Sequence, residues 1–504
     1  MTSAAPVVLG LDLGTGSLKA VLLDGRGAVL ASATRGYPTS TPHPGWAEQD
    51  PADWLGALRG VVDELTARDP AAIARLCGIG LCSAAHLPVL LDAHDAVLRP
   101  AILWSDQRSH AEVAALKARA ASRIADIACN EPGCTWTLPQ LLWVWAHEPQ
   151  VRGRVQTLLG SKDYLLFRLT GEKAMDPGSA AATLMSDARG RTWAQELTEM
   201  AGLPDAAFPA LRPASSRAGT VTPEAARTFG LPAGVPVVTG TLDSAAELVG
   251  CGLLAAGGDG MIRVGSAGGV MLLADAPVLR PGVITYPHVA DGVWYHQAGT
   301  NACATSLGWI RDLAGAMRGE TPPALGYGDL DRLADSCEPG ADGLLFHPYL
   351  QGERAPHWSA SLRGSFTGLD VRHGWPQIVR AVMEGVAFSL RDCLGMFGDD
   401  ARTLRAAVLS GGVVRSPVWS GILTDVLGLE TRTVAHGDSA LGAAMLAGAG
   451  VGVFASLEDA VSRCVRREGG LRPDPALADA YARAFERYRR VGAFVASLDA
   501  PSRG

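Results

Sequence analysis

The chain has 504 residues, which is too long for one hydrophobic core, so we expect two domains. Apolar residues make up 48% and charged residues 19% of the sequence, as in soluble globular proteins. The formal net charge of −7 argues against nucleic acid or an anionic membrane surface as a partner.

The cysteines, the first residues and one long uncharged stretch indicate in which cellular compartment the protein is found. Nine cysteines are scattered without a CxxC pair, which favours buried free thiols over disulfides or a metal cluster. The first residues lack the basic region and cleavage site of a signal peptide. The uncharged stretch 439–457 is rich in Ala and Gly, which favours a buried helix over a membrane span. We therefore expect a cytoplasmic protein.

The first predicted elements are two strands joined by a tight turn. The apolar segment VVLGLDLG runs into the turn GTGS, and LKAVLLD forms the second strand. A helix is predicted from Pro51, where apolar residues recur at amphipathic spacing. A strand pair around GIGLCSAAHLPVLLD follows, and PVVTGTLDSAAELVG predicts a strand, a turn and the start of a helix.

The opening pattern returns near Gly258. The segment DGMIRVGSAGGVMLLADAPVL parallels VVLGLDLGTGSLKAVLLDGRGAVL: an apolar strand, a turn rich in Gly and Ser, and a second apolar strand. A single echo of this kind suggests a duplicated domain, and a chance likeness of two hairpins is the alternative. We predict two domains, residues 1–248 and 249–504.

The first turn has the composition of a phosphate-binding loop. Gly14 and Gly16 allow backbone N–H groups to approach phosphate oxygens, and Thr15 and Ser17 supply hydroxyls. Asp12, at the end of the preceding strand, is suited to Mg²⁺ through water. The motif is neither a Walker A loop nor a dinucleotide fingerprint, and an ordinary hairpin turn is the alternative.

Two further glycine-rich turns lie in the second half. Gly265, Ser266 and Gly268 occupy the equivalent turn of the second hairpin, and one such loop per domain would clamp phosphates between them. Gly411 and Gly412 follow the strand AAVLS, where a flat ring such as adenine could approach the backbone. A plain strand-to-helix turn is the alternative for the second pair.

Asp243 is the candidate catalytic residue. It follows a predicted strand at the domain junction, where a carboxylate can accept the proton of a substrate hydroxyl during phosphoryl transfer. The alternative is helix capping, because Asp243 precedes SAAE and could bind unpaired N–H groups of the first helical turn. Spacing alone favours capping.

Four segments together resemble the FGGY family of carbohydrate kinases, and the xylulokinases within it most closely. Gly364-x-Phe366-x-Gly368-Leu369 followed by QIVRAVME is similar to the second family signature. PYLQGERAPHW, SKDYLLFRLTGE and PHPGWAEQDPADW resemble three other family segments. The resemblance runs from about residue 8 to about residue 450.

The resemblance implies an α/β, two-domain actin-like ATPase (ribonuclease H-like) fold, with duplicated domains around a central cleft. It implies a carbohydrate kinase that uses ATP and Mg²⁺, with Asp243 as general base and Asp12 toward the metal. In the sugar site it implies His86, Trp104, Asp106 and Asp243. The residues implied at ATP are Thr15, Gly16, Ser17, Gly265, Ser266, Gly268, Gly411, Gly412, Ser416 and Gly442.

Three departures leave the substrate open. Gln140 stands where the family has Lys, and Val413 stands where the nucleotide turn has a third glycine. Ala84 and Ala85 precede His86 where xylulokinases have Gln and Met, and losing a substrate hydrogen bond can change preference by orders of magnitude. His86 itself could be an ordinary core histidine.

We expect in-line transfer of the γ-phosphoryl group of ATP to D-xylulose, giving D-xylulose 5-phosphate. Gluconate or another ketose or polyol is the alternative substrate. A non-catalytic sugar sensor and an actin-like ATPase are the alternatives of another class. A homodimer is left open by the sequence.

Overall fold

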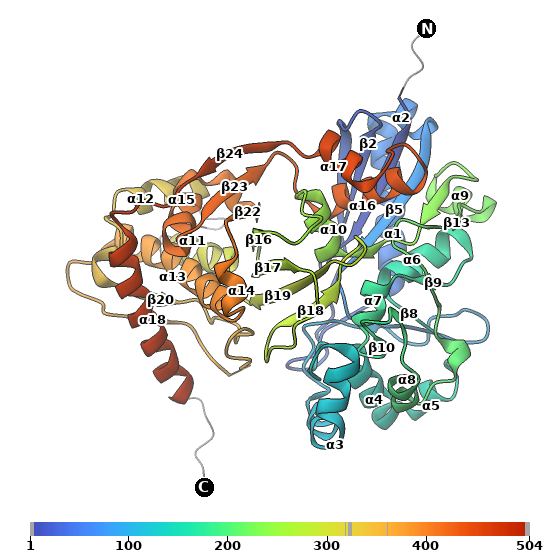
Figure 1. Cartoon of the computed structure of the whole chain (residues 1–504), viewed down its shortest axis with the longest axis horizontal. Helices are drawn as coiled ribbons and strands as arrows, with labels where there is room; N and C mark the ends of the chain where they lie inside the picture. The colour runs from blue at the N-terminus through green and yellow to red at the C-terminus, as the bar shows by residue number, and fades with distance from the viewer. Residues whose placement is uncertain (1–4, 318, 321–324, 360, 499–504) are drawn as a thin grey trace.

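The computed structural model describes residues 5–317, 319–320, 325–359 and 361–498, so the outer ends of both predicted domains lie outside the described residues. Figure 1 shows two lobes, with the N-terminal half on the right and most of the C-terminal half on the left. Each lobe contains a seven-stranded mixed sheet. The expected two-domain α/β fold is confirmed.

The N-terminal sheet has the order β13-β14-β5-β1-β2-β3, and β15 also pairs with β5. Strand β1 is antiparallel to β2 and parallel to β5. The strands are β1 (Val7–Leu13), β2 (Ser17–Asp24), β3 (Val29–Gly36), β5 (Leu76–Ser83), β13 (Arg217–Thr220), β14 (Pro236–Val238) and β15 (Thr241–Leu242).

The C-terminal sheet has the order β18-β19-β17-β16-β22-β23-β24. Strand β16 is antiparallel to β17 and parallel to β22, so the arrangement around β1 recurs around β16. The repeated hairpin read from the sequence is therefore a repeated sheet topology. The strands are β16 (Asp259–Val264), β17 (Gly268–Ala274), β18 (Ile284–Pro287), β19 (Trp294–Thr300), β22 (Ala406–Gly411), β23 (Glu430–Val434) and β24 (Arg467–Leu471).

Five small two-stranded sheets and the helices complete the described residues. The small sheets pair β4 (Glu48–Gln49) with β7 (Ala101–Ile102), β6 (Val89–Leu91) with β8 (Thr157–Leu159), β9 (Ala174–Met175) with β12 (Ala210–Leu211), β10 (Ser186–Asp187) with β11 (Thr192–Trp193), and β20 (Leu345–His347) with β21 (Ser365–Thr367). The first nine α-helices are α1 (Pro51–Arg68), α2 (Pro70–Ala74), α3 (His110–Ala128), α4 (Thr137–His147), α5 (Pro149–Arg152), α6 (Ser161–Thr170), α7 (Pro177–Ala181), α8 (Gln195–Ala201) and α9 (Pro223–Phe229). The others are α10 (Asp243–Gly250), α11 (Ala304–Met317), α12 (Tyr327–Asp335), α13 (Trp375–Gly395), α14 (Asp399–Arg402), α15 (Pro417–Leu427), α16 (Ser439–Gly450), α17 (Leu457–Cys464) and α18 (Ala478–Leu498). The 3-10 helices are η1 (Asp205–Ala207), η2 (Ala341–Gly343) and η3 (Gly412–Arg415).

Strand β1 is covered on both faces, which explains its continuous apolar run. Every residue of β1 except Asp12 is buried. Side chains alternate along a strand, so Leu9 and its alternate neighbours pack with helix α1, whereas Val8 packs with Leu441 of helix α16. Asp50 caps the N-terminus of α1, and Pro51 is its first residue, as the sequence predicted.

Helix α16 belongs to the second half of the chain but packs against the first sheet, and Figure 1 shows it beside β2 and β5. Glycines allow the backbone of α16 to approach the backbones of β5 and α10 closely. A β-carbon on Gly80 would lie 1.9 Å from the carbonyl oxygen of Ala443, and one on Gly442 would lie 1.8 Å from that of Ala246 in α10. The predicted buried helix thus connects the second half of the chain to the first sheet and to α10. Over the described residues, no helix combines the length and hydropathy needed to cross a bilayer.

Candidate functional site

The candidate site in the N-terminal lobe forms where three parallel strands end at one edge of the sheet. In the parallel pairing of β1 with β5, Asp12 lies opposite Cys82 and Leu13 opposite Ser83. In the pairing of β15 with β5, Leu242 also lies opposite Ser83. The first glycine loop, the segment 84–86 and Asp243 follow these residues directly. Such edges of α/β sheets are where ligands bind.

Asp12 and Asp243 share one electrostatic environment. Burial and the nearby Asp243 carboxylate raise the pKa of Asp12 to about 7, and Arg263 acts in the opposite direction. The Cys82 thiol lies 3.5 Å from Asp12 Oδ1 as a weak donor. The two carboxylates predicted from separate motifs are therefore brought together.

Asp243 is the first residue of helix α10. Burial raises its pKa, and the Arg263 guanidinium lowers it. Its Oδ1 accepts the N–H of Ser244 at 2.7 Å, so the carboxylate does bind one unpaired donor of the first turn. This is its only hydrogen bond within the described residues, which leaves Oδ2 available. Capping and a catalytic role are compatible here.

The first glycine loop is tied to Trp104. The loop closes through a hydrogen bond from Gly14 N to Ser17 O at 3.0 Å. Trp104 Nε1 donates to Thr15 Oγ1 at 3.0 Å. Gly16 is exposed, and a β-carbon there would meet nothing within 4 Å. The tip of the loop is thus open to an incoming group.

The second glycine loop and the predicted nucleotide turn lie side by side in the C-terminal lobe. Parallel pairing of β16 with β22 puts Val264 opposite Gly411, so Gly265 and Gly412 follow at the same edge. Gly411 has φ of 88°, which requires glycine, and a β-carbon there would lie 2.5 Å from the Val264 carbonyl oxygen. The side chain of Val413 is buried in the core, which accounts for the missing third glycine.

Three predicted ATP residues have packing or capping partners of their own. Gly268 abuts Cys303, whose Sγ would lie 2.2 Å from a β-carbon at residue 268. The Ser416 hydroxyl accepts the N–H of Trp419 at 3.0 Å, as the N-cap of α15, and donates to Asp331 at 2.7 Å. Gly442 lies inside α16 at its crossing with α10. Packing and capping alone explain these residue types.

Ser266 is the remaining member of the second loop. Its side chain is exposed, and its carbonyl oxygen accepts the N–H of Cys303 at 2.9 Å. The adjacent Gly265 carbonyl oxygen accepts the N–H of Ala304, the first residue of helix α11, also at 2.9 Å. The loop is therefore fixed against the start of α11 while the Ser266 hydroxyl faces solvent.

His86 has the contacts of a core histidine. It adopts φ of 64°, and its Nδ1 donates to the carbonyl oxygen of Ala182 at 2.7 Å. The Tyr286 hydroxyl donates to Nε2 at 2.8 Å. Burial lowers the pKa of His86 to about 4, so the ring is neutral at pH 7. Tyr286 comes from β18, so this contact joins the two lobes.

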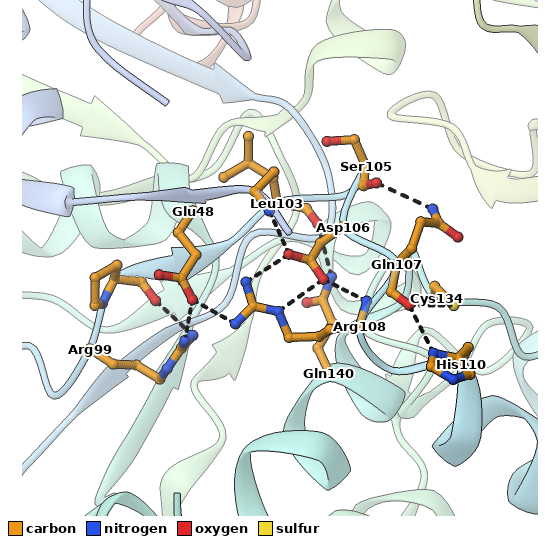
Figure 2. A network of polar contacts seen from close by, with 12 residues as sticks. Glu48, Arg99, Leu103, Ser105, Asp106, Gln107, Arg108, His110, Cys134 and Gln140 are labelled. Atoms are coloured by element: carbon orange, nitrogen blue, oxygen red, sulfur yellow. Dashed lines mark hydrogen bonds and ion pairs between the residues drawn. The ribbon is translucent and has the colours of Figure 1, made fainter. Parts of the chain in front are cut away.

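Asp106 lies in a buried polar network rather than facing a free space (Figure 2). Its Oδ2 accepts from Ala47 N at 2.6 Å and from Arg108 Nη2 at 2.7 Å, and its Oδ1 accepts from Arg108 Nε at 2.9 Å. Arg108 also pairs with Glu48 at 2.6 Å. Figure 2 also shows Gln140, whose Nε2 donates to the Leu103 carbonyl oxygen at 3.3 Å. These contacts fix the loop that carries Trp104.

Sequence reasoning missed two arginines at the site. The guanidinium carbon of Arg354 lies 5.2 Å from the Trp104 ring centroid, and its buried Nε has no hydrogen bond within the described residues. Arg263 Nη1 lies 3.2 Å from Glu247 Oε2. Both arginines lie in segments that the sequence had already singled out. Arg354 belongs to PYLQGERAPHW, and Arg263 occupies the place of Asp12 in the repeated hairpin.

Comparisons with known proteins identify the family of the chain. Residues 7–250 match the N-terminal domain of the FGGY family of carbohydrate kinases, and residues 260–451 match its C-terminal domain. Xylulose kinase of Escherichia coli strain K12 is 34% identical over 488 residues, covering 96% of this chain and 98% of the relative. Gluconokinase of Bacillus subtilis strain 168 is 30% identical over 452 residues, covering 87% and 86%. The crystal structure of xylulose kinase from Rhodospirillum rubrum superposes with a TM-score of 0.87 at 33% identity, covering 98% of this chain and 99% of that one. The chain therefore belongs to the FGGY family of carbohydrate kinases, and it is a sugar kinase.

Proposed function

We propose that this enzyme transfers the γ-phosphoryl group of ATP to a primary hydroxyl of D-xylulose, giving D-xylulose 5-phosphate. One observation carries the proposal. Asp12, Asp243 and the first glycine loop end at one sheet edge, and Arg263, from the strand before the second glycine loop, is close enough to lower the pKa of both carboxyls. The xylulose kinases among the relatives support the choice of sugar.

Asp243 acts as the general base. Its carboxylate has one oxygen free of hydrogen bonds to described residues, and burial raises its pKa toward the operating pH. A higher pKa makes the carboxylate a stronger base toward the proton of the sugar hydroxyl. The neighbouring Arg263 guanidinium acts in the opposite direction and favours the ionised form.

Mg²⁺ enters with ATP as part of the substrate and neutralises phosphate charge. Asp12 fits a place beside it, because its buried carboxylate has a pKa raised by burial, Asp243 and Asp438, which a cation would relieve. The described residues contain no group of three or more His, Cys, Asp or Glu side chains arranged to hold a metal ion. This matches an ion held by one carboxylate together with phosphates.

Gluconate is the second candidate substrate, because a gluconokinase is among the relatives. Ala84 and Ala85 line a cavity of about 20 Å³, which has room for about one water and not for a sugar. Arg354, whose guanidinium carbon lies 5.2 Å from the Trp104 ring centroid, donates from Nη2 to the Thr300 carbonyl oxygen and has a buried Nε without a hydrogen bond to a described residue, and such a donor suits a carboxylate or a hydroxyl.

A coupled assay of ADP release tests the proposal across ketoses, aldonates and polyols. We expect the highest kcat/KM with D-xylulose and a product that co-migrates with D-xylulose 5-phosphate. A gluconate preference of tenfold or more would replace the first candidate with the second. ADP release independent of any sugar would contradict both.

A further inference from the structure

Arg263 occupies a position in the cleft that mirrors Asp12. Each is the penultimate residue of the strand that leads into a glycine loop: Asp12 in β1 and Arg263 in β16. In the antiparallel pairing, Asp12 lies opposite Lys19 and Arg263 lies opposite Gly269. The duplicated topology therefore presents a carboxylate from one lobe and a guanidinium from the other.

The guanidinium of Arg263 has donors to spare. Its Nη1 forms an ion pair with Glu247 Oε2 at 3.2 Å, and Nε and Nη2 make no hydrogen bond to a described residue. Glu247 is itself held by the hydroxyl of Ser410. The Arg263 side chain is 40% exposed, and its Nε lies 3.9 Å from where a β-carbon on Gly265 would be. An anchored arginine thus borders the second glycine loop with open donors.

The carboxylates around Arg263 make the cleft negative, and Arg263 supplies a positive charge there. The carboxylates of Asp12, Asp243 and Glu247 all lie close enough to raise the pKa of Arg263. The nearby cation Lys19 is paired with Asp438 at 2.6 Å. A polyphosphate entering a site with this many carboxylates needs a cation with free hydrogen-bond donors, and a planar guanidinium suits phosphate oxygens.

We propose that Arg263 binds the γ-phosphoryl group of ATP and stabilises its charge during transfer, while Glu247 holds the guanidinium in place. In the step, the bond from the γ-phosphorus to the bridging oxygen breaks, and ADP leaves with that electron pair. A new bond forms to the sugar oxygen, whose proton passes to Asp243. The inference rests on the proposed function and adds a catalytic residue to it.

The test compares nucleotides that differ only in the γ-phosphoryl group. Titration calorimetry without sugar measures the affinity of Arg263→Gln for ADP and for the β,γ-imido analogue of ATP, both with Mg²⁺. We expect the analogue to bind about 10- to 100-fold more weakly than to the unchanged enzyme, while ADP affinity changes less than about threefold. Arg263→Lys should recover part of the loss, and kcat of Arg263→Gln should fall by about 10²–10³-fold.

Arg432→Gln is the matched control, because Arg432 lies on β23 of the same sheet and pairs with Glu430 and Asp259 outside the site. It should leave both affinities unchanged. Equal weakening of ADP and the analogue by Arg263→Gln, or no weakening of either, would overturn the inference. Because the titration uses no sugar, an incorrect choice of substrate changes the ADP-release screen and leaves this result intact.

Discussion

Replacing Asp243 by Asn separates the proposed chemistry from folding. Asn has the size of Asp, and its Oδ1 can still accept the Ser244 N–H that Asp243 accepts at 2.7 Å, but its amide cannot take up a proton. General-base catalysis contributes about 10²–10⁴-fold to rate. That range corresponds to about 3–5 kcal/mol of activation free energy. We expect kcat to fall by this factor.

The effect of the same change on stability has the opposite sign. Burial raises the pKa of Asp243 above its value in the unfolded chain, because the charged form loses hydration. The unfolded chain then releases the proton at lower pH than the folded protein. Stability is therefore lost as pH rises above about 4, and the loss is complete above the folded pKa. Asn carries no such loss.

Steady-state ADP release and thermal unfolding at several pH values measure both effects. Asp243→Asn should melt at the same temperature as the unchanged enzyme or higher at pH 8, with the difference shrinking toward pH 4. A loss of kcat under tenfold with an unchanged melting temperature would refute the catalytic role. A large fall in melting temperature would instead mean that the carboxylate chiefly supports α10.

Two other substitutions test the crossing of α16 with α10 and the contact of Trp104 with the first glycine loop. Gly442→Ala should lower the free energy of unfolding by at least about 1 kcal/mol in denaturant titration, because its β-carbon would lie 1.8 Å from the Ala246 carbonyl oxygen. Gly56→Ala, in helix α1 with nothing within 4 Å of the new β-carbon, should leave stability equal or higher and serves as its control. Trp104→Phe removes the 3.0 Å hydrogen bond to Thr15 of the first glycine loop and should raise the KM of ATP about fivefold, with an unchanged KM arguing that this hydrogen bond does not position the loop.

Features encoded by neighbouring residues could be predicted from the sequence. The hairpin around Gly14, the helix start at Asp50 and Pro51, and the buried helix beginning at Ser439 all depend on a few consecutive residues. The repeated hairpin in the sequence also indicated the duplication that the two sheets show. Comparing the two copies of this local pattern suggested a duplicated domain, and the fold class followed from the resemblance to the FGGY family.

Long-range contacts could not be predicted in the same way. His86 was expected at the sugar, but its two ring nitrogens bind the Ala182 carbonyl oxygen and the hydroxyl of Tyr286, which lies two hundred residues away in the sequence. Asp106 finds the backbone of Ala47, whose position depends on the whole lobe. A carboxylate or imidazole in a motif reveals its chemistry, but only the fold decides whether a protein atom or a ligand binds it.

The placement of helix α16 has a consequence for synthesis on the ribosome. Strands β1 and β5 emerge early, yet the helix that covers their Val8 face begins only at Ser439. At about 5–20 residues per second, the apolar surface waits roughly 20–70 s for its cover. The N-terminal sheet therefore completes its packing only when the far end of the chain arrives, so the first half of the chain does not finish folding on its own.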